Sequence, residues 1–229
     1  GRPGMGKTAQ MCNMILNQGK MGIPTLTFSL EMSKEQLAER LLCIETGIPT
    51  TNMRLGLLNQ AQLDAISEAV KTIKQLPIYI DSNFNVDLNY VISTTRRYVR
   101  THDVDVVYLD YIQLLAERNT DSTNELGRIS RALKLLSNEL EISSVVGSQL
   151  NRNLESREDK RPQLSDLRQS GNLEEDTDIV IGLYRDIMYN GKTKFTDLLE
   201  ELILKNRSGP RGMLPLKFEE ECGRINDGK

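Results

Sequence analysis

The chain opens with Gly1-Arg2-Pro3-Gly4-Met5-Gly6-Lys7-Thr8. A glycine, four residues, then glycine, lysine and threonine is the spacing of a loop that wraps nucleotide phosphates. The glycines let backbone N–H groups turn toward the phosphates, the lysine reaches the β/γ oxygens, and the threonine hydroxyl coordinates Mg²⁺. A glycine-rich turn that ends in Lys-Thr by chance is the alternative, but apolar residues at helical spacing follow directly, at Met11, Met14 and Ile15. The sequence therefore predicts a P-loop for ATP or GTP with Mg²⁺.

Length and composition indicate a single globular domain over residues 1–229. Hydrophobic residues make up 38% and charged residues 27% of the 229, which is ordinary for a chain that buries a full core. No apolar run approaches the roughly 20 residues that span a bilayer, so we expect no membrane partner. Because a P-loop normally follows a buried strand, we expect this strand, an N-terminal domain and a linker to lie outside this sequence.

The cysteines and the histidine exclude other chemistries. The three cysteines, Cys12, Cys43 and Cys222, form no CxxC pair, and an odd number argues against a disulfide framework. We expect buried thiols in a reducing cytoplasm. His102 is the only histidine and ends a helix-like stretch, so a catalytic triad or a histidine-bound metal is excluded.

Apolar runs of strand length alternate with segments of helical period. Strands are expected at Thr25–Leu30, Ile78–Ile80, Val104–Leu109, Ser144–Gly147, Ile179–Tyr184 and Leu202–Leu204. Helices are expected from an N-cap at Ser33, along Leu63–Ile73, along Leu88–Val99 and along Leu126–Leu140. This alternation predicts an α/β fold in which a twisted, mostly parallel sheet is flanked by helices on both faces.

Three polar side chains follow predicted strands. Asp110 ends the run Val104–Leu109, where it either holds Mg²⁺ beside the P-loop or caps a turn. Glu31 ends the strand at Thr25–Leu30, where it either orients the attacking water or belongs to the start of the next helix. Gln149 either senses the γ-phosphate or is a polar residue leaving a strand.

Two basic features lie further along the chain. Lys205 and Arg207 are two residues apart in an extended segment, so they share a face just before the turn Ser208-Gly209-Pro210. They either act as a finger on a neighbouring subunit's ATP or are solvent-facing cations at a hairpin tip. Residues 151–170 are polar and irregular. Their arginines and lysines could follow a phosphate backbone, but acidic residues interleave with them, as in a solvated loop.

Together these segments resemble the C-terminal motor domain of the DnaB-like replicative DNA helicases, which has a RecA-like P-loop ATPase core. Besides the P-loop, the resemblance rests on Phe28–Met32, Leu109–Leu114, Ser148–Arg152, Lys160–Pro162, Ser165–Gly171, Tyr184–Asp186 and Lys205–Pro210, in the family's order. The P-loop is generic. The Ser-Leu-Glu-Met, Ser-Gln-Leu-Asn-Arg and Lys-x-Arg-x-Gly-Pro segments are specific to the family.

The resemblance implies a role for each matching residue. Gly1, Gly4, Gly6, Lys7 and Thr8 would bind ATP, with Thr8 and Asp110 at Mg²⁺. Glu31 would be the catalytic carboxylate, Gln149 the γ-phosphate sensor and Arg40 an aid at the phosphates. Lys205 and Arg207 would act in trans, and Arg168, Gln169 and Gly171 would grip single-stranded DNA. Many members have Glu at Gln169 and a small residue such as Ala at Gly1.

The resemblance also implies a homohexameric ring that moves on single-stranded DNA, with a primase and a helicase loader as partners. The formal net charge of −3 gives no support for DNA binding. A ring, however, brings six copies of a short loop to one strand, so a modest charge per subunit suffices. A RecA-type recombinase filament or a clock-type ATPase would use the same core. A small-molecule kinase lacks a lid-like arginine cluster here.

Overall fold

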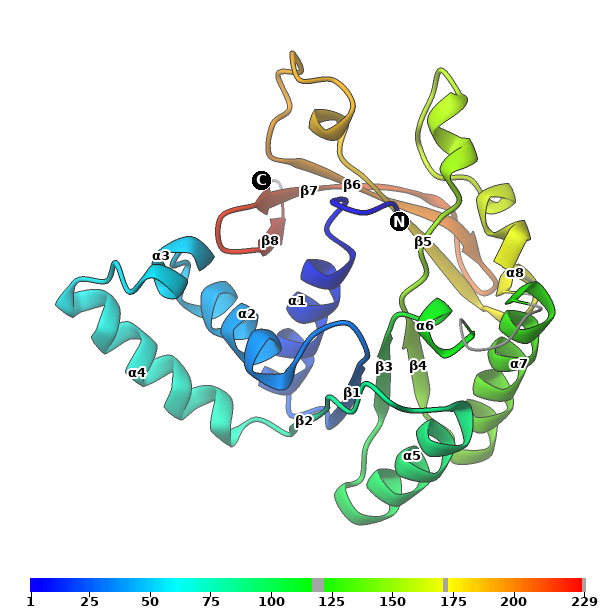
Figure 1. The fold of residues 1–229 in the computed structure, drawn as a ribbon, viewed down its shortest axis with the longest axis horizontal. Coiled ribbons are helices and arrows are strands. Elements are labelled where there is room, and N and C mark those ends of the chain that lie inside the picture. Colours follow the sequence, from blue (N-terminus) through cyan, green and yellow to red (C-terminus); the bar gives the residue numbers. More distant parts are fainter. Residues whose placement is uncertain (117–121, 171–172, 228–229) are drawn as a thin grey trace.

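A parallel sheet of four strands lies at the centre of the molecule (Figure 1). The computed structural model describes residues 1–116, 122–170 and 173–227. The sheet has the order β2 (Ile78–Asp81), β1 (Thr25–Ser29), β3 (Val106–Asp110) and β4 (Ser143–Val146), with all neighbours parallel. Every residue of β1 and β3 is buried, so both strands are covered on both faces. For β3 this fits its apolar run Val106–Leu109.

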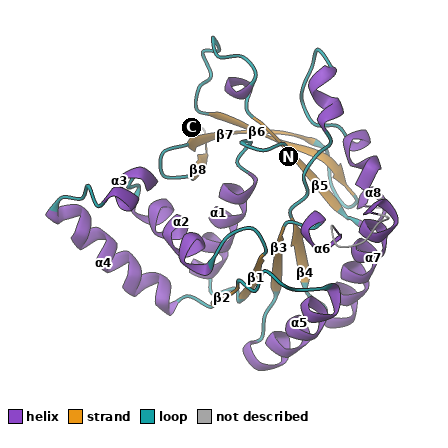
Figure 2. Cartoon of the chain, in the orientation of Figure 1, coloured by secondary structure: helices purple, strands orange, loops and turns teal. Residues whose placement is uncertain are grey.

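Helices cover both faces of this sheet (Figure 2). Val107 and Leu109 of β3 pack with α5 (Leu88–His102) and α7 (Ser122–Leu140). Val106 and Tyr108 point to the other face and pack with α1 (Lys7–Lys20). This alternation follows from the two-residue period of a strand. Against α1 lies α2 (Lys34–Thr46), followed by α3 (Thr50–Leu55) and α4 (Gln60–Gln75).

The last part of the chain forms an antiparallel sheet. Its order is β5 (Ile179–Tyr184), β6 (Leu198–Asn206), β7 (Gly212–Glu219) and β8 (Arg224–Asp227). The predicted α/β class with a parallel, helix-flanked sheet is confirmed. The separate antiparallel sheet was not predicted from the sequence. The shorter elements are α6 (Gln113–Ala116), α8 (Leu173–Asp176) and the 3₁₀ turns Arg152–Ser156, Leu164–Ser170 and Asp186–Met188.

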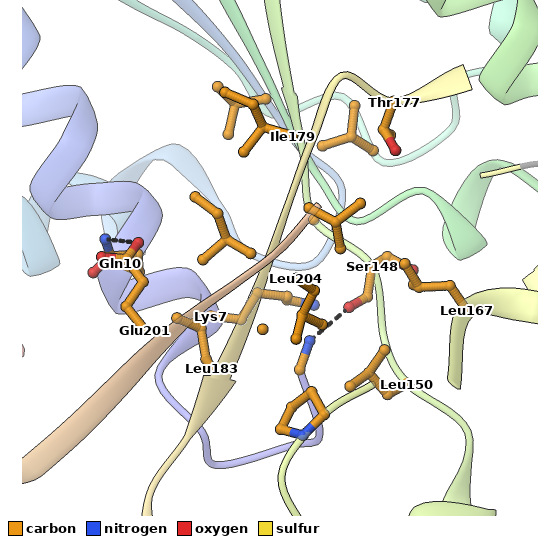
Figure 3. A pocket seen from close by; sticks show the side chains of 18 of the residues that line it. Lys7, Gln10, Ser148, Leu150, Leu167, Thr177, Ile179, Leu183, Glu201 and Leu204 are labelled. Carbon is orange, nitrogen blue, oxygen red and sulfur yellow. Dashed lines mark hydrogen bonds between the residues drawn. The ribbon is translucent and has the colours of Figure 1, made fainter. Parts of the chain in front are cut away.

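A cavity of about 180 Å³ separates the two sheets (Figure 3). Within the described chain β4 pairs only with β3, and β5 pairs only with β6. Both strands line this cavity through Val145, Val146 and residues 179–183, and α1 closes it with Met11 and Met14. Ile179 and Ile181 of β5 are exposed, and the residues of β4 are exposed or half-buried, so these two edges are not covered within the described chain.

The cysteines and the histidine lie where the sequence suggested. Cys12, Cys43 and Cys222 are buried free thiols, and burial raises the pKa of Cys12 to about 12. His102 ends α5 and stacks on Tyr98. In the described ranges no helix has both the length and the apolar character needed to cross a membrane.

Candidate nucleotide-binding site

The glycine-rich loop presents the N-terminus of α1 to the site. Gly4 and Gly6 have φ angles of 80° and 87°, which residues with a Cβ rarely adopt. Gly6 is the N-cap of α1, so the cap position offers no side-chain acceptor, and the first turn of the helix holds no acidic residue. The N–H groups at the start of this helix are therefore available to phosphate oxygens.

Lys7, Thr8 and Asp110 form the polar centre of the site. Thr8 Oγ1 donates to Asp110 Oδ2 over 2.8 Å, and Lys7 Nζ lies 3.4 Å from Asp110 Oδ1 and 4.0 Å from the Tyr111 ring centroid. Asp110 is buried at the end of β3, and its Oδ1 accepts no hydrogen bond from the described residues. Asp110 is thus adjacent to the P-loop threonine.

These groups suit Mg²⁺, which binds through one or two protein oxygens while keeping waters and substrate phosphates as its other ligands. The Thr8 hydroxyl and the buried Oδ1 of Asp110, which accepts no hydrogen bond from the described residues, are oxygen donors of this kind. Among the described residues no group of three or more histidine, cysteine, aspartate or glutamate side chains could hold a metal by itself.

A cavity of about 360 Å³ brings the predicted site residues together. Glu31 comes from the loop after β1, Arg40 from α2 and Gln149 from the loop after β4, and all three line the same cavity as the P-loop. The lining P-loop residues include Gly1, Gly4, Gly6, Lys7 and Thr8. Parallel strands place their carboxyl ends at one edge of the sheet, so residues about 120 positions apart meet there.

Glu31 lies before helix α2 and does not belong to its first turn. Ser33 caps α2 by accepting from the Gln36 amide, and the Gln36 side chain accepts from the Ser33 amide, which completes a capping box. The helical acid of the first turn is Glu35. Glu31 lies before the cap, in a turn closed by Ser29 Oγ donating to the Met32 carbonyl over 2.6 Å. It is exposed and lines the cavity.

Gln113 supports Gln149, a role that sequence reasoning missed. Its amide nitrogen donates to the Gln149 carbonyl over 3.0 Å and to Ser148 Oγ over 3.0 Å, and its amide oxygen accepts from the Gln149 N–H over 3.2 Å. Gln113 therefore fixes the backbone of Gln149. Its place three residues after Asp110 was the only signal in the sequence that could have pointed to it.

Arg185, Phe218 and Glu220 complete the cavity wall. Arg185 lies in the matched segment Tyr184–Asp186, but no role was assigned to any of the three from the sequence. Arg185 is buried, stacks on the Phe218 ring at 4.5 Å and donates to the Gly4 carbonyl over 3.3 Å. Its two-point contact with Glu220 holds the pKa of that carboxyl below its usual value. The antiparallel sheet thus supplies one wall of the phosphate loop. Arg40 Nε, by contrast, is buried without a hydrogen bond to any of the described residues.

Lys205 and Arg207 do not join this cavity. Lys205 Nζ donates to the Glu174 carbonyl over 2.5 Å, and Arg207 pairs with Asp178 over 2.8 Å at the end of β6. Arg207 is 58% exposed. As predicted, β6 and β7 form a hairpin whose turn holds Ser208, Gly209 and Pro210.

The candidate DNA loop is described only in part. Arg168 and Gln169 belong to the 3₁₀ segment Leu164–Ser170, but the whole of Gly171 and the Gln169 and Arg168 side chains lie outside the described residues. Arg157 binds Asp166 at two points, over 3.0 and 2.9 Å, and Arg161 binds Glu200 over 2.6 and 2.7 Å. These two arginines are thus paired within the chain.

The fold and the cavity define a P-loop nucleotide-binding α/β domain. A family model, DnaB-like helicase C terminal domain, matches residues 1–227, and the chain belongs to this family.

Relatives extend the match. The chain is 41% identical to a probable replicative DNA helicase of Trieres chinensis (99% of this chain, 52% of that protein). It is 38% identical to the replicative DNA helicase DnaB of Geobacillus stearothermophilus (98% and 50%). It therefore spans about half the length of the curated relatives that it matches.

Solved structures agree in fold. A DnaB-like replicative helicase, described with its interactions with primase, superposes with a TM-score of 0.94 at 35% identity, over 100% of this chain and 57% of that one. A separately solved ATPase domain also gives 0.94 at 35% identity, over 100% of this chain and 82% of that one.

Proposed function

We propose that this chain is the ATP-hydrolysing motor of a replicative DNA helicase that moves on single-stranded DNA as a ring of six subunits. The observation that carries the proposal is the shared cavity of the P-loop, Glu31, Arg40 and Gln149, which Lys205 and Arg207 do not line. One subunit then holds most of an ATP site and offers its two cations elsewhere. Membership of the helicase family supports this assignment.

Each residue of the cavity has a separate role in ATP hydrolysis. Lys7 and the loop N–H groups bind the phosphates, and Thr8 with Asp110 holds Mg²⁺, which neutralises phosphate charge. Glu31 orients a water and takes its proton as the water oxygen bonds to the γ-phosphorus. The bond from that phosphorus to the β,γ-bridging oxygen breaks, giving ADP and inorganic phosphate. Gln149, held by Gln113, contacts the γ-phosphate and responds to its departure.

Lys205 and Arg207 act on the ATP of the neighbouring subunit. Both lie at the end of β6, outside the cavity of their own P-loop, and the exposed Arg207 can reach another chain. An arginine supplied in trans stabilises the charge of the transition state and accelerates hydrolysis about 10³- to 10⁵-fold in other nucleotidases. Arg168, Gln169 and Gly171 grip the DNA, and a primase and a loader are the expected partners, in the cytoplasm.

The cavity between β4 and β5 holds a further strand that precedes the P-loop. The apolar lining and the two edges left unpaired within the described chain support this, because such a strand would pair with both edges and join the sheets. The motor is then part of a longer protein with an N-terminal domain and a linker.

The test is strand displacement on a forked DNA duplex by the full-length protein that carries this chain. Lys7→Ala is expected to abolish both ATP hydrolysis and unwinding. Lys20→Ala, at the other end of the same helix and paired with Glu45, is the matched control and should keep both. Normal unwinding by Lys7→Ala would refute the proposal.

A recombinase-type assembly protein has the same core and remains the second candidate. Electron micrographs of the protein with ATP and single-stranded DNA distinguish the two. Closed rings of six support the motor, and an open helical filament supports the assembly protein.

A further inference from the structure

The short segment Leu173–Asp178 touches both cations of the proposed in-trans pair. The Glu174 backbone carbonyl accepts a hydrogen bond from the Lys205 ammonium, and Asp178 accepts two hydrogen bonds from Arg207. The Arg207 N–H donates to the Asp178 carbonyl over 2.9 Å, and its guanidinium donates to Asp178 Oδ1 over 2.8 Å. Hydrogen bonds from the side chains of both Lys205 and Arg207 and from the Arg207 N–H thus converge on this one segment, which Arg131 and Lys134 of α7 also bind.

This segment directly follows the candidate DNA loop. The 3₁₀ turn Leu164–Ser170 ends shortly before α8 begins at Leu173, and the two elements pack against each other. The side chains of Leu167 and Leu173 are both buried, so each end of the connection is anchored in apolar surroundings. The packing of the turn Leu164–Ser170 against α8 is thus the contact through which a displacement of the loop would act on α8 and on the two cations.

The strand register keeps the segment beside the cations. Ile179 at the start of β5 pairs with Asn206, and Val180 pairs with Lys205. Asp178 therefore lies opposite Arg207 because of backbone pairing, and not because two long side chains happen to meet. Lys134 of α7 binds the other carboxylate oxygen, Oδ2, so the carboxylate joins α7, β5 and the hairpin end of β6.

We propose that Asp178 is a positioning residue that couples the DNA loop to Arg207, so that DNA bound by one subunit sets the placement of the cations it offers to its neighbour. The inference rests on the proposed in-trans role of Lys205 and Arg207. The Lys134 ammonium holds the pKa of Asp178 below its usual value, so the carboxylate is charged at neutral pH. An ion pair as exposed as this one adds little to folding stability, so its geometry is the property that matters.

The experiment measures ATP hydrolysis by the full-length protein with and without saturating single-stranded DNA. Asp178→Asn keeps the shape and the hydrogen-bond acceptor but removes the charge. The ratio of the DNA-stimulated rate to the unstimulated rate is expected to fall by about 2- to 30-fold, the range seen for mutations along a coupling network. Asp178→Glu should restore part of the ratio.

The matched control is Glu139→Gln. Glu139 also lies on α7 and forms an exposed two-point pair with Arg96 of α5, on the side of α7 away from the hairpin end of β6. Its ratio should equal that of the wild type.

Three outcomes overturn the inference. In the first, Asp178→Asn keeps the wild-type ratio within twofold. In the second, the affinity for a labelled oligonucleotide falls together with the ratio, which would place Asp178 in the DNA site itself. In the third, Glu139→Gln lowers the ratio as well. Arg207→Ala distinguishes a failure of this inference from a failure of the proposed function. If Arg207→Ala leaves ATP hydrolysis by the neighbouring subunit intact, the proposed in-trans role itself is refuted.

Discussion

Two inactive variants should restore each other's activity if the site is shared between subunits. Lys7→Ala removes a subunit's own phosphate contact but leaves its Arg207 in place. Arg207→Ala leaves the subunit's own cavity intact but removes what it offers to the next one. Arg207 follows β6 and lies six positions beyond Glu201, which binds Gln10 of the P-loop helix. At about 3.3 Å per residue this is about 20 Å, too far for Arg207 to return to its own cavity.

The size of the recovery follows from counting interfaces. In a ring of head-to-tail contacts mixed one to one, an interface is active when an Arg207→Ala subunit holds the ATP and a Lys7→Ala subunit supplies the arginine. With random mixing this combination occurs at about one quarter of the interfaces. Each variant alone should show a residual rate about 10³- to 10⁵-fold below the wild type. The mixture should therefore approach about a quarter of the wild-type rate when interfaces act independently.

The assay is phosphate release with saturating single-stranded DNA. The two variants carry different affinity tags and are co-expressed, and two purification steps in series isolate rings that contain both. Lys7→Ala mixed with the double variant Lys7→Ala/Arg207→Ala is the control, because that ring holds no intact site and should stay inactive. A mixed ring that stays as inactive as its separate components would refute an arginine shared across the interface.

Two further predictions concern Gln113 and Glu201. Gln113→Ala should lower kcat about tenfold or more with little change in KM, because it loosens the backbone of Gln149 rather than the phosphate loop, and steady-state ATP hydrolysis checks this. Burial raises the pKa of Glu201 above its usual 4.5, so the folded state binds the carboxyl proton more tightly than the unfolded chain does. The folded state therefore loses stability as pH rises from about 4.5 through the raised pKa. Glu201→Gln should therefore raise Tm relative to the wild type, and the difference should grow between about pH 4 and pH 7 in thermal melts.

Strands and helix ends that depend only on nearby residues could be predicted from the sequence. β3 follows a largely apolar run because both of its faces are covered, and the sequence places β1 and β3 within two residues of their observed bounds. The cap at Ser33 was visible because a capping box needs only residues 33 to 36. The meeting of Thr8 with Asp110 followed from a general property, since Asp110 ends β3 at the carboxyl edge of the parallel sheet, where a P-loop and its helix are expected.

Elements set by distant partners were not predictable. Only Leu202–Leu204 was recognised out of β6, because Glu200 and Glu201 interrupt the apolar pattern. Both carboxylates are buried, and their partners are Arg161 and Gln10, which lie 39 and 191 residues away. In β7, Met213 and Leu214 are exposed, so no alternation marks the strand. The stack of Arg185 on Phe218 depends on strand register, which local sequence does not encode.

The pairing of arginines in residues 151–170 changes what DNA binding should look like. Arg157 is held by Asp166, and Arg161 is held by the buried Glu200, so these cations already have partners inside the chain. Each phosphate neutralised on a single strand contributes about −0.7 to the slope of log affinity against log salt. Arg157→Gln should leave this slope unchanged, whereas Arg168→Ala should make it shallower by about 0.7 for each phosphate that Arg168 neutralises in the wild type.

Fluorescence anisotropy of a labelled oligonucleotide, measured at several salt concentrations with full-length rings, gives both slopes. An Arg157→Gln slope as shallow as that of Arg168→Ala would mean that the pairs with Asp166 open on DNA. Asp166 would then release Arg157 when DNA binds, so that Arg157 also contacts phosphate. If the pair stays closed, DNA is bound by Arg168 and by backbone amides instead.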